Sequence, residues 1–433
     1  MYPKTYYAET RRERSDQSAL KAASSAQVVI VGGGYAGLAT ALGLAERGVH
    51  DVLLLDAHEI GFGASGRNGG FVFAGYSLGE QALIERMGAD TARWMYGLTV
   101  AAMKLIRARI DTYKIDCQPI DSGVLWANWF NDPQVLRSRQ KLLCDHFGVD
   151  WPLLPGAALR EMLLTDRYHG ALREPDAFHV HPLDLALGLA RAANSLGVRV
   201  HSSTPVLKIE RNGARWRIGT LGHQIEAAQV VLAGGGYLNR IQPLLYGSQL
   251  PIATYVAVTE PLGERLQSAI RTNAAIYDSR FAFDYYRPLS DSRLLWGGRI
   301  SILERSPAAV ARVLKRDIAR VYPQLADVKI DYAWNGLMSY ARHEMPQVGR
   351  LDDGLWYAQG FGGHGVATTT AIGELLAKAI AEDDPSWRRF EPFGLQPTFR
   401  PFGLLGAEAL YWLLQRKDAW RARKSRASVV CHK

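Results

Sequence analysis

The sequence predicts an α/β fold of two interwoven domains, and three observations indicate it. The chain has 433 residues, which is long for a single hydrophobic core. A short apolar run at 27–31 leads directly into glycines and a helical segment, as at the start of a parallel sheet. Several β-type runs between 250 and 302 indicate a second sheet, which we expect to be antiparallel.

The composition excludes several classes of protein. With 48% hydrophobic and 21% charged residues, the chain is neither disordered nor collagen-like. Cys117, Cys144 and Cys431 form no CxxC pair and no zinc spacing, so we expect no metal site and a reducing compartment. Residues 1–21 lack an apolar signal-peptide core, and no apolar run reaches about 18 residues, so a cytoplasmic protein is expected.

The net charge of +9 is concentrated at the C-terminus. Residues 416–433 carry seven basic side chains and one acid, whereas the other 415 residues carry 44 basic against 41 acidic ones. A general basic face for nucleic acid is therefore not indicated.

The first elements form a βαβ unit. After a polar arm at 1–26, expected to be partly ordered at most, a strand at 27–31 precedes a helix at 35–48 that ends at Gly48, and a second strand follows at 51–56. Further along, the pattern predicts helices at 82–113, 133–147, 182–196, 306–322 and 365–382, strands at 198–201 and 354–357, and a hairpin within 204–232 that turns at Asn212-Gly213.

We expect the domains to be discontinuous in sequence. A Rossmann-like nucleotide-binding domain would comprise 27–105, 175–249 and 333–392, and an α+β substrate domain on an antiparallel sheet would comprise 106–174 and 250–332. The arm at 1–26 and a tail at 393–433 complete the chain.

The turn between the first strand and helix reads G-x-G-x-x-G. Gly32 suits the tight turn, Gly34 lets the backbone approach a pyrophosphate, and Gly37 lets the helix pack closely on the strand. Asp56 ends the second strand, where its carboxylate can accept both ribose hydroxyls and repel a 2′-phosphate. This predicts an adenine dinucleotide, FAD or NAD. Three later glycine-rich stretches, at 61–70, 230–237 and 360–365, favour FAD because a long dinucleotide needs several close backbone approaches.

These residues resemble the FAD-dependent oxidoreductases of the D-amino-acid oxidase superfamily, and most of all its branch of γ-glutamylputrescine oxidoreductases and bacterial L-pipecolate oxidases. The resemblance covers about 6–392 and lies in the stretches IGFGASGRNGG, VAVTEPL, FDYYR, RLLWGGR and YAQGFGGHGVATTTAIGE. It implies that FAD, bound non-covalently, contacts Gly32, Gly34, Gly37, Asp56, Ser65, Gly66, Arg67, Asn68, Val206, Gly235, Gly362, Gly363, His364 and Gly365.

At several positions this sequence has other residues than related sarcosine oxidases have. The two arginines and the lysine that hold a substrate carboxylate there align with Gly69, Val72 and Ala367. The lysine that activates oxygen aligns with Leu295. Carboxylate binding by that route is therefore absent, and a membrane quinone joins oxygen as a candidate electron acceptor.

Aromatic residues predict a substrate site for an amine or a ring. The candidates are Tyr255, Phe283, Tyr285, Tyr286, Trp334, Arg342, His343 and His364. Core packing of the rings, a surface salt bridge of Arg342 and a structural His364 are the alternatives. We expect oxidation of a C–N bond in an amine or secondary amino acid to an imine, by hydride transfer to flavin N5, with no catalytic residue required beyond the flavin. A flavoprotein that modifies tRNA is the alternative function.

The tail at 401–426 is apolar and then basic. Residues 401–415 contain one charge, Glu408, and are too few to span about 30 Å of hydrocarbon. They suit either a helix lying on an anionic membrane surface or a helix docked on the protein.

Overall fold

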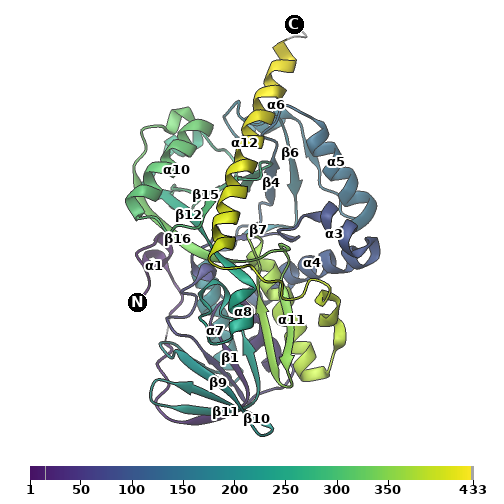
Figure 1. Ribbon diagram of the computed structural model, residues 1–433. Coiled ribbons are helices and arrows are strands. Elements are labelled where there is room, and N and C mark those ends of the chain that lie inside the picture. The colour runs from purple at the N-terminus through teal and green to yellow at the C-terminus, as the bar shows by residue number, and fades with distance from the viewer. Residues whose placement is uncertain (15, 431–433) are drawn as a thin grey trace.

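The computed structural model describes residues 1–14 and 16–430, and its two domains lie one above the other in Figure 1. Cys431 and Lys433, counted above among the cysteines and the basic residues, lie outside the described residues.

The first domain is built on a sheet of eight strands. Five of them run parallel in the order β18-β11-β1-β2-β8, and β17 joins β18 as an antiparallel edge. The hairpin of β9 and β10 extends from β11, as predicted, but turns at Gly213-Ala214, one residue later than expected. The strands are β1 (Ser24–Val31), β2 (Val52–Leu55), β8 (Arg199–His201), β9 (Val206–Asn212), β10 (Arg215–Thr220), β11 (Gln224–Leu232), β17 (Gln347–Asp352) and β18 (Leu355–Gln359).

Helices cover the centre of this sheet because its central strands are apolar: all four residues of β2 are buried. Helix α2 (Tyr35–Glu46) follows β1 and packs against α7 (Pro182–Ser195) and α11 (Gly365–Glu382). The fourth helix of this group is α4 (Ala89–Thr112). The Rossmann-like part of the predicted fold class is confirmed.

The second domain is built on another eight-stranded sheet, in the order β16-β12-β15-β14-β13-β4-β6-β5. All neighbours are antiparallel except β13 and β4. Helix α10 (Pro307–Val321) packs on β12, β15 and β16. The strands are β4 (Val124–Ala127), β5 (Leu153–Leu154), β6 (Ala171–Glu174), β12 (Gln249–Thr259), β13 (Ala275–Asp278), β14 (Asp284–Pro288), β15 (Leu294–Ser301) and β16 (Ile330–Ala341).

Short elements connect the two sheets. Strands β3 (Phe71–Val72) and β7 (Phe178–His179) pair between them. The remaining helices are α1 (Tyr6–Thr10), α3 (Glu80–Met87), α5 (Gln134–Leu142), α6 (Gly156–Met162), α8 (Pro243–Gly247), α9 (Glu264–Gln267) and α12 (Phe402–Val430).

Two predicted segments differ from the structure. The helix expected at 82–113 is interrupted at Gly88, whose φ of 77° ends α3 and starts α4 in a new direction. The arm at 1–26 is more ordered than expected, because α1 buries Tyr6 and Tyr7, and the Tyr7 hydroxyl donates to the Asn68 carbonyl at 2.9 Å.

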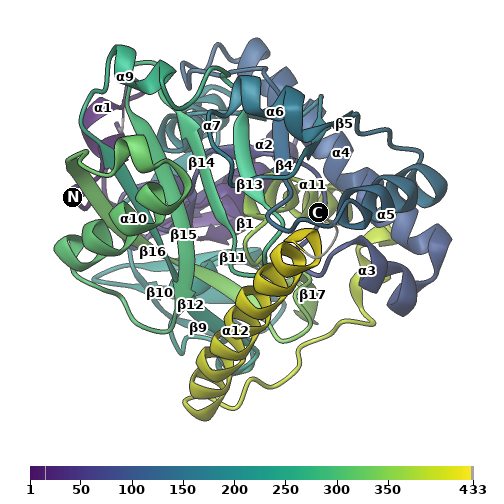
Figure 2. The ribbon, with the colours of Figure 1, turned by 90° about the horizontal axis from the view of Figure 1, so that it is seen from above.

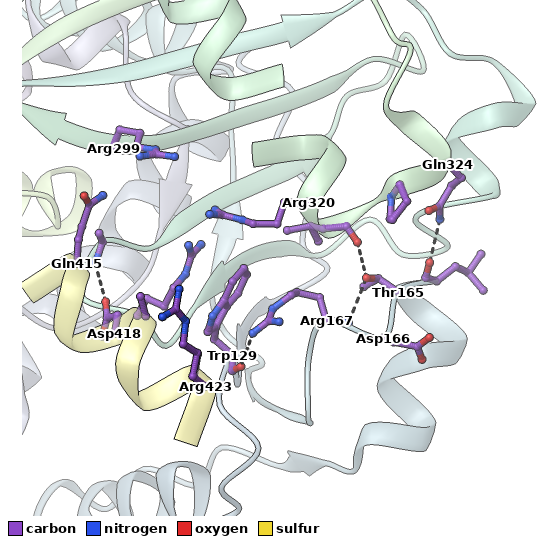
Figure 3. A pocket seen from close by; sticks show the side chains of 17 residues that line it. Trp129, Thr165, Asp166, Arg167, Arg299, Arg320, Gln324, Gln415, Asp418 and Arg423 are labelled. Carbon is purple, nitrogen blue, oxygen red and sulfur yellow. Dashed lines mark hydrogen bonds between the residues drawn. The ribbon is translucent and has the colours of Figure 1, made fainter. Parts of the chain in front are cut away.

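Helix α12 is docked along the second sheet, which confirms one of the two alternatives for the tail (Figures 1 and 2). The Glu408 carboxylate accepts from Ile302 N at 2.9 Å, and the Tyr411 hydroxyl accepts from Ile300 N at 3.2 Å. Figure 3 shows Gln415, Asp418 and Arg423 of α12 facing Trp129, Arg167 and Arg320 across a cavity of about 960 Å³. No helix within the described part of the chain is both long and apolar enough to cross a bilayer.

The opposite face of α12 is apolar and exposed. Leu405, Trp412, Leu413 and Trp420 have between 58% and 64% of their surface exposed. These residues recur at helical spacing on one side, whereas Glu408, Tyr411 and Asp418 lie on the docked side.

The guanidinium of Arg287 on β14 joins the two domains and the N-terminal arm. Its Nε donates to the Gly69 carbonyl at 2.8 Å, and its Nη2 donates to the Val180 carbonyl at 2.8 Å and contacts the Tyr7 hydroxyl at 3.4 Å. Its Nη1 donates to Nδ1 of His179 at 3.0 Å, while Nε2 of His179 bonds the Asn273 carbonyl at 2.8 Å. These bonds require a neutral imidazole with its proton on Nε2.

Burial and the neighbouring Arg287 lower the pKa of His179 from 6.5 to about 3. The unfolded chain therefore takes up this proton first, and the free energy of unfolding falls as the pH drops below about 6.5, by about 1.4 kcal/mol for each unit. Glutamine can keep both hydrogen bonds without titrating. Between pH 7 and pH 5, urea unfolding of the wild type should lose about 2 kcal/mol more than that of His179→Gln; equal losses would contradict the assigned protonation.

Candidate functional site

A cavity of about 1270 Å³ lies between the two sheets and is lined by both domains. It extends from the carboxyl ends of β1 and β2, at Gly32 and Asp56, to the inner side of the second sheet at Phe283 and Tyr285. Ligand sites in α/β proteins lie at such strand ends and usually have about 300–1,000 Å³. The volume therefore suits a ligand as large as a dinucleotide together with a small molecule.

The glycine turn forms one end of the cavity. Gly32 has a φ of 119°, and a Cβ there would lie 2.5 Å from the Ala233 carbonyl oxygen, so only glycine fits. Gly34 precedes α2 and lines the cavity, whereas Gly37 packs below the turn against the Gly32 carbonyl. The N-terminus of α2 thus faces the cavity, where its N–H groups and dipole favour a phosphate.

Asp56 lies beside this turn at the end of β2. Its Oδ2 accepts from Gly33 N at 2.6 Å and its Oδ1 from His58 N at 2.7 Å, and each oxygen retains a second lone pair. Burial raises the pKa of Asp56 above its usual range. Val206 and Gly235 line the cavity near the same end.

The segment 61–70 places Arg67 against the middle of the cavity. The guanidinium lies 4.5 Å over the Phe62 ring, its Nε donates to the Phe62 carbonyl at 2.7 Å, and its Nη1 donates to the Asn335 carbonyl at 3.2 Å. Nη2 is buried with no partner among the described residues, and burial lowers the pKa of Arg67. An unpaired, buried cationic donor needs an acceptor, so this position fits an anionic or carbonyl-rich group of a dinucleotide.

The neighbours of Arg67 shape this segment. Ser65 lines the cavity and accepts from Tyr35 N at 2.9 Å. Asn68 also lines it, and its side chain donates to the Ser65 carbonyl at 2.8 Å and accepts from Gly70 N at 2.7 Å. Gly66 lies behind the surface, packed against Gly61.

The segment 360–365 forms the opposite wall of the cavity. Gly362, at φ 61°, donates to the Ser339 carbonyl at 2.8 Å, and Gly363 N donates to Ser77 Oγ at 2.9 Å. Gly365 begins α11, so this helix also directs its N-terminus at the cavity. His364 lies against the Phe73 ring at 4.8 Å, and burial lowers its pKa to about 4, so its imidazole is neutral at neutral pH.

A row of aromatic rings continues from His364. The centroid distances are 5.5 Å from Phe73 to Tyr277, 5.9 Å from Tyr277 to Phe283 and 6.2 Å from Phe283 to Tyr285. All four rings line the cavity. These rings give this end of the cavity an aromatic wall, unlike the polar glycine end.

Glycines on two segments hold Tyr285 in place. A Cβ at Gly69 would lie 2.7 Å from the Tyr285 ring, and a Cβ at Gly297 would overlap it. Tyr285 therefore fills the space next to Gly69, where sarcosine oxidases were expected to place an arginine. Val72 and Ala367 are buried, so neither brings a charge to the cavity.

Only some predicted substrate residues line the cavity. Phe283, Tyr285, Arg342 and His364 do, and Arg342 is exposed. Tyr286 stacks on Trp296 in the core, and Tyr255 donates to the Leu303 carbonyl at 2.7 Å. Trp334 donates from Nε1 to the Arg67 carbonyl at 2.9 Å and so supports the Arg67 segment from behind, while His343 contacts the Gly394 carbonyl at 3.3 Å.

The sequence pattern did not indicate several cavity residues. Phe73 and Tyr277 stand outside any motif, and Glu80 and Arg139 occupy polar helical segments whose meeting depends on the tertiary fold. The docked face of α12 also contributes Glu408 and Tyr411.

Solved structures resemble the whole fold. An L-proline dehydrogenase from P. horikoshii superimposes with a TM-score of 0.71 at 18% identity, covering 86% of this chain and 98% of that one. A glycine oxidase from Bacillus cereus gives a TM-score of 0.67 at 20% identity, covering 83% and 96%.

Sequence comparison agrees with the geometry of the site. The chain is 37% identical to gamma-glutamylputrescine oxidoreductase of Escherichia coli over 95% of this chain and 98% of that protein. It is 31% identical to the probable oxidoreductase OrdL of Haemophilus influenzae over 90% of each chain. Residues 27–379 match the FAD dependent oxidoreductase family. The protein belongs to this family, is an enzyme that acts on CH–NH bonds and uses FAD as its cofactor.

Proposed function

We propose that the enzyme oxidises the C–N bond of an amine of the γ-glutamylputrescine type, in the breakdown of amines. The observation that carries this proposal is the row of rings at the end of the cavity, from Phe73 to Tyr285, which offers an amine a dry aromatic surface. The relative at 37% identity over nearly the whole chain supports the same substrate. L-Pipecolate, a compact ring, is the second substrate to test.

We further propose which residues hold FAD. The pyrophosphate lies at Gly32, Gly34 and the start of α2, above Gly37, and the ribose lies at Asp56. Ser65, Arg67 and Asn68, on a turn shaped by Gly66, contact the phosphates and the flavin, while Val206 and Gly235 close the adenosine end. The flavin pyrimidine lies at 362–365, because the N-terminus of α11 favours negative charge there.

The protein contributes position and desolvation. When bound, FAD would supply the acceptor for the hydride lost by the carbon beside the substrate nitrogen. The rings exclude water and lower the pKa of a bound ammonium, so that the neutral amine with its free electron pair is favoured. His364 stays neutral and adds no repelling charge. This chemistry needs no dedicated acid–base pair.

A quinone is our proposed electron acceptor. Leu295, which aligns with the oxygen-activating lysine of sarcosine oxidases, is fully buried, and no lysine lines the cavity within the described residues. The exposed face of α12, with Leu405, Leu413 and Trp420, would bring the enzyme to the membrane where quinones reside. Arg416, Lys417 and Lys424 supply charge that anionic headgroups attract, whereas Arg421 pairs with Asp132 and Arg423 faces the protein.

Replacing Arg67 tests the FAD site. Arg67→Met removes the unpaired buried donor, and a lost hydrogen bond to a charged group costs about 1.5–3 kcal/mol, so FAD should bind about 10- to 100-fold more weakly. Fluorescence titration of the apoprotein measures this. Arg47→Met, which alters an arginine on the far end of α2, is the control and should bind FAD normally. An unchanged dissociation constant in Arg67→Met would contradict the assignment.

Anaerobic mixing tests the substrate. γ-Glutamylputrescine should bleach the flavin absorbance of the wild type faster than L-pipecolate does, because an extended amine fills the long cavity. Adding a soluble quinone analogue should then restore the absorbance faster than adding oxygen. If neither amine bleaches the flavin, the proposed substrate class is wrong.

Point substitutions test the membrane contact better than truncation, because deleting α12 would also remove Glu408 and Tyr411 from the cavity wall. The triple variant Leu405→Ser, Leu413→Ser, Trp420→Ser should lose more than tenfold in binding to phosphatidylglycerol vesicles, measured by co-sedimentation. Leu221→Ser, at another exposed leucine, is the control. Equal sedimentation of all three proteins would exclude lipid as the partner of this face.

A further inference from the structure

An ion pair lies inside the cavity wall beside the row of rings. Arg139 of α5 and Glu80, the first residue of α3, meet with Nη2 and Oε1 2.8 Å apart. Both residues line the cavity, and their side chains are 19% and 12% exposed. Phe73 and Tyr277 line the same wall, so the pair is close to the proposed amine site.

Stacking holds Arg139 in a fixed position and leaves donors free. Its guanidinium lies 4.3 Å over the Trp126 ring and 5.0 Å over the Trp151 ring. The bond to Glu80 is its one hydrogen bond within the described part of the chain, and Nε is buried without a partner. The buried Tyr277 hydroxyl makes no geometric hydrogen bond with the described residues, and it lies close enough to Arg139 for the guanidinium to oppose the rise in its pKa that burial causes. Unpaired donors in a buried site are costly unless a ligand satisfies them.

The charges around the pair are balanced. Glu174 lies nearby, and burial raises its pKa to about 8, so it is protonated at neutral pH, while His364 is neutral. At this part of the cavity wall the pair therefore presents one cation and one anion. A ligand that carries both an ammonium and a carboxylate complements this arrangement better than a simple amine does.

Other arginines on the cavity wall are less suited to a carboxylate. Arg280 bonds Asp278 and Asp284, and Arg299 bonds Asp317 through both Nε and Nη2. Next to Gly69, the Tyr285 ring occupies the space. Arg139 combines free donors, fixed orientation and a position near the rings.

We propose that Arg139 and Glu80 bind the amino-acid end of the substrate, with Arg139 on the α-carboxylate and Glu80 on the α-ammonium. The rest of the substrate, with the amine to be oxidised, then lies along the rings. This specificity site rests on the proposed function, since γ-glutamylputrescine carries such an end six methylene groups and an amide away from its reactive amine.

A binding experiment separates this proposal from the proposed reaction. γ-Glutamylpropylamide has the same amino-acid end but lacks the terminal amine that is to be oxidised, and N-propylacetamide lacks both. Titrated into FAD-loaded enzyme and followed by the flavin absorbance, γ-glutamylpropylamide should bind the wild type at least tenfold more tightly than N-propylacetamide. Arg139→Gln should weaken the binding of γ-glutamylpropylamide about 10- to 100-fold and leave the binding of N-propylacetamide unchanged. Arg139→Lys should restore part of the lost affinity.

Kinetics supply the second readout. Arg139→Gln and Glu80→Gln should raise KM for γ-glutamylputrescine about 10- to 100-fold but change KM for N-acetylputrescine, which keeps the reactive amine, less than twofold. Arg47→Gln is the matched control, because the Arg47–Glu374 pair has similar exposures of 19% and 17% and does not line the cavity.

Three outcomes would overturn the assignment. The wild type could bind both amides equally tightly, or Arg139→Gln could bind γ-glutamylpropylamide as tightly as the wild type does. The variants could also raise KM equally for both amine substrates, which would indicate that the pair is only structural. If γ-glutamylpropylamide binds through Arg139 but γ-glutamylputrescine leaves the flavin unbleached, the specificity site stands and the proposed reaction fails.

Discussion

The buried guanidinium of Arg287 is the contact on which the rest of the site depends. From the second sheet it reaches the Gly69 carbonyl of the first domain, the Val180 carbonyl, the neutral His179 and the Tyr7 hydroxyl of the arm. Four segments far apart in sequence therefore meet at one side chain. Their meeting sets the distance between the two sheets, and so the width of the cavity in which FAD and an amine must lie together. A buried cation with several acceptors also resists replacement, because each acceptor would be left unpaired.

The parts of the fold that depend on local sequence could be predicted. The strand, glycine turn and helix at 27–46 follow from glycine conformation and apolar runs, and Asn212-Gly213 indicates its hairpin. Contacts between distant segments could not. Tyr285 and Tyr286 are neighbours in one strand, yet only Tyr285 faces the cavity, and which face is inward depends on the register of β14 with β15. Glu80 and Arg139 are separated by 59 residues and belong to no motif.

Helix α12 has one face on the cavity and an opposite face that is exposed. Its inner face contributes Glu408 and Tyr411 to the cavity wall, and its outer face exposes Leu413 and Trp420. The two alternatives for the tail, docking and membrane contact, are thus compatible, because they use opposite faces of one helix. A helix that packs on the protein through a few polar contacts keeps its apolar face available for lipid.

The central claim is that one cavity holds FAD at the glycine turn and an extended amine along the rings. A crystal structure of the FAD-loaded enzyme with bound γ-glutamylpropylamide tests it most directly. The account predicts the pyrophosphate on the N-terminus of α2, the propyl chain against Phe73 and Tyr277, and the α-carboxylate within hydrogen-bond distance of Arg139. A glutamyl end lying at the exposed Arg342, or a ligand outside the row of rings, would contradict it.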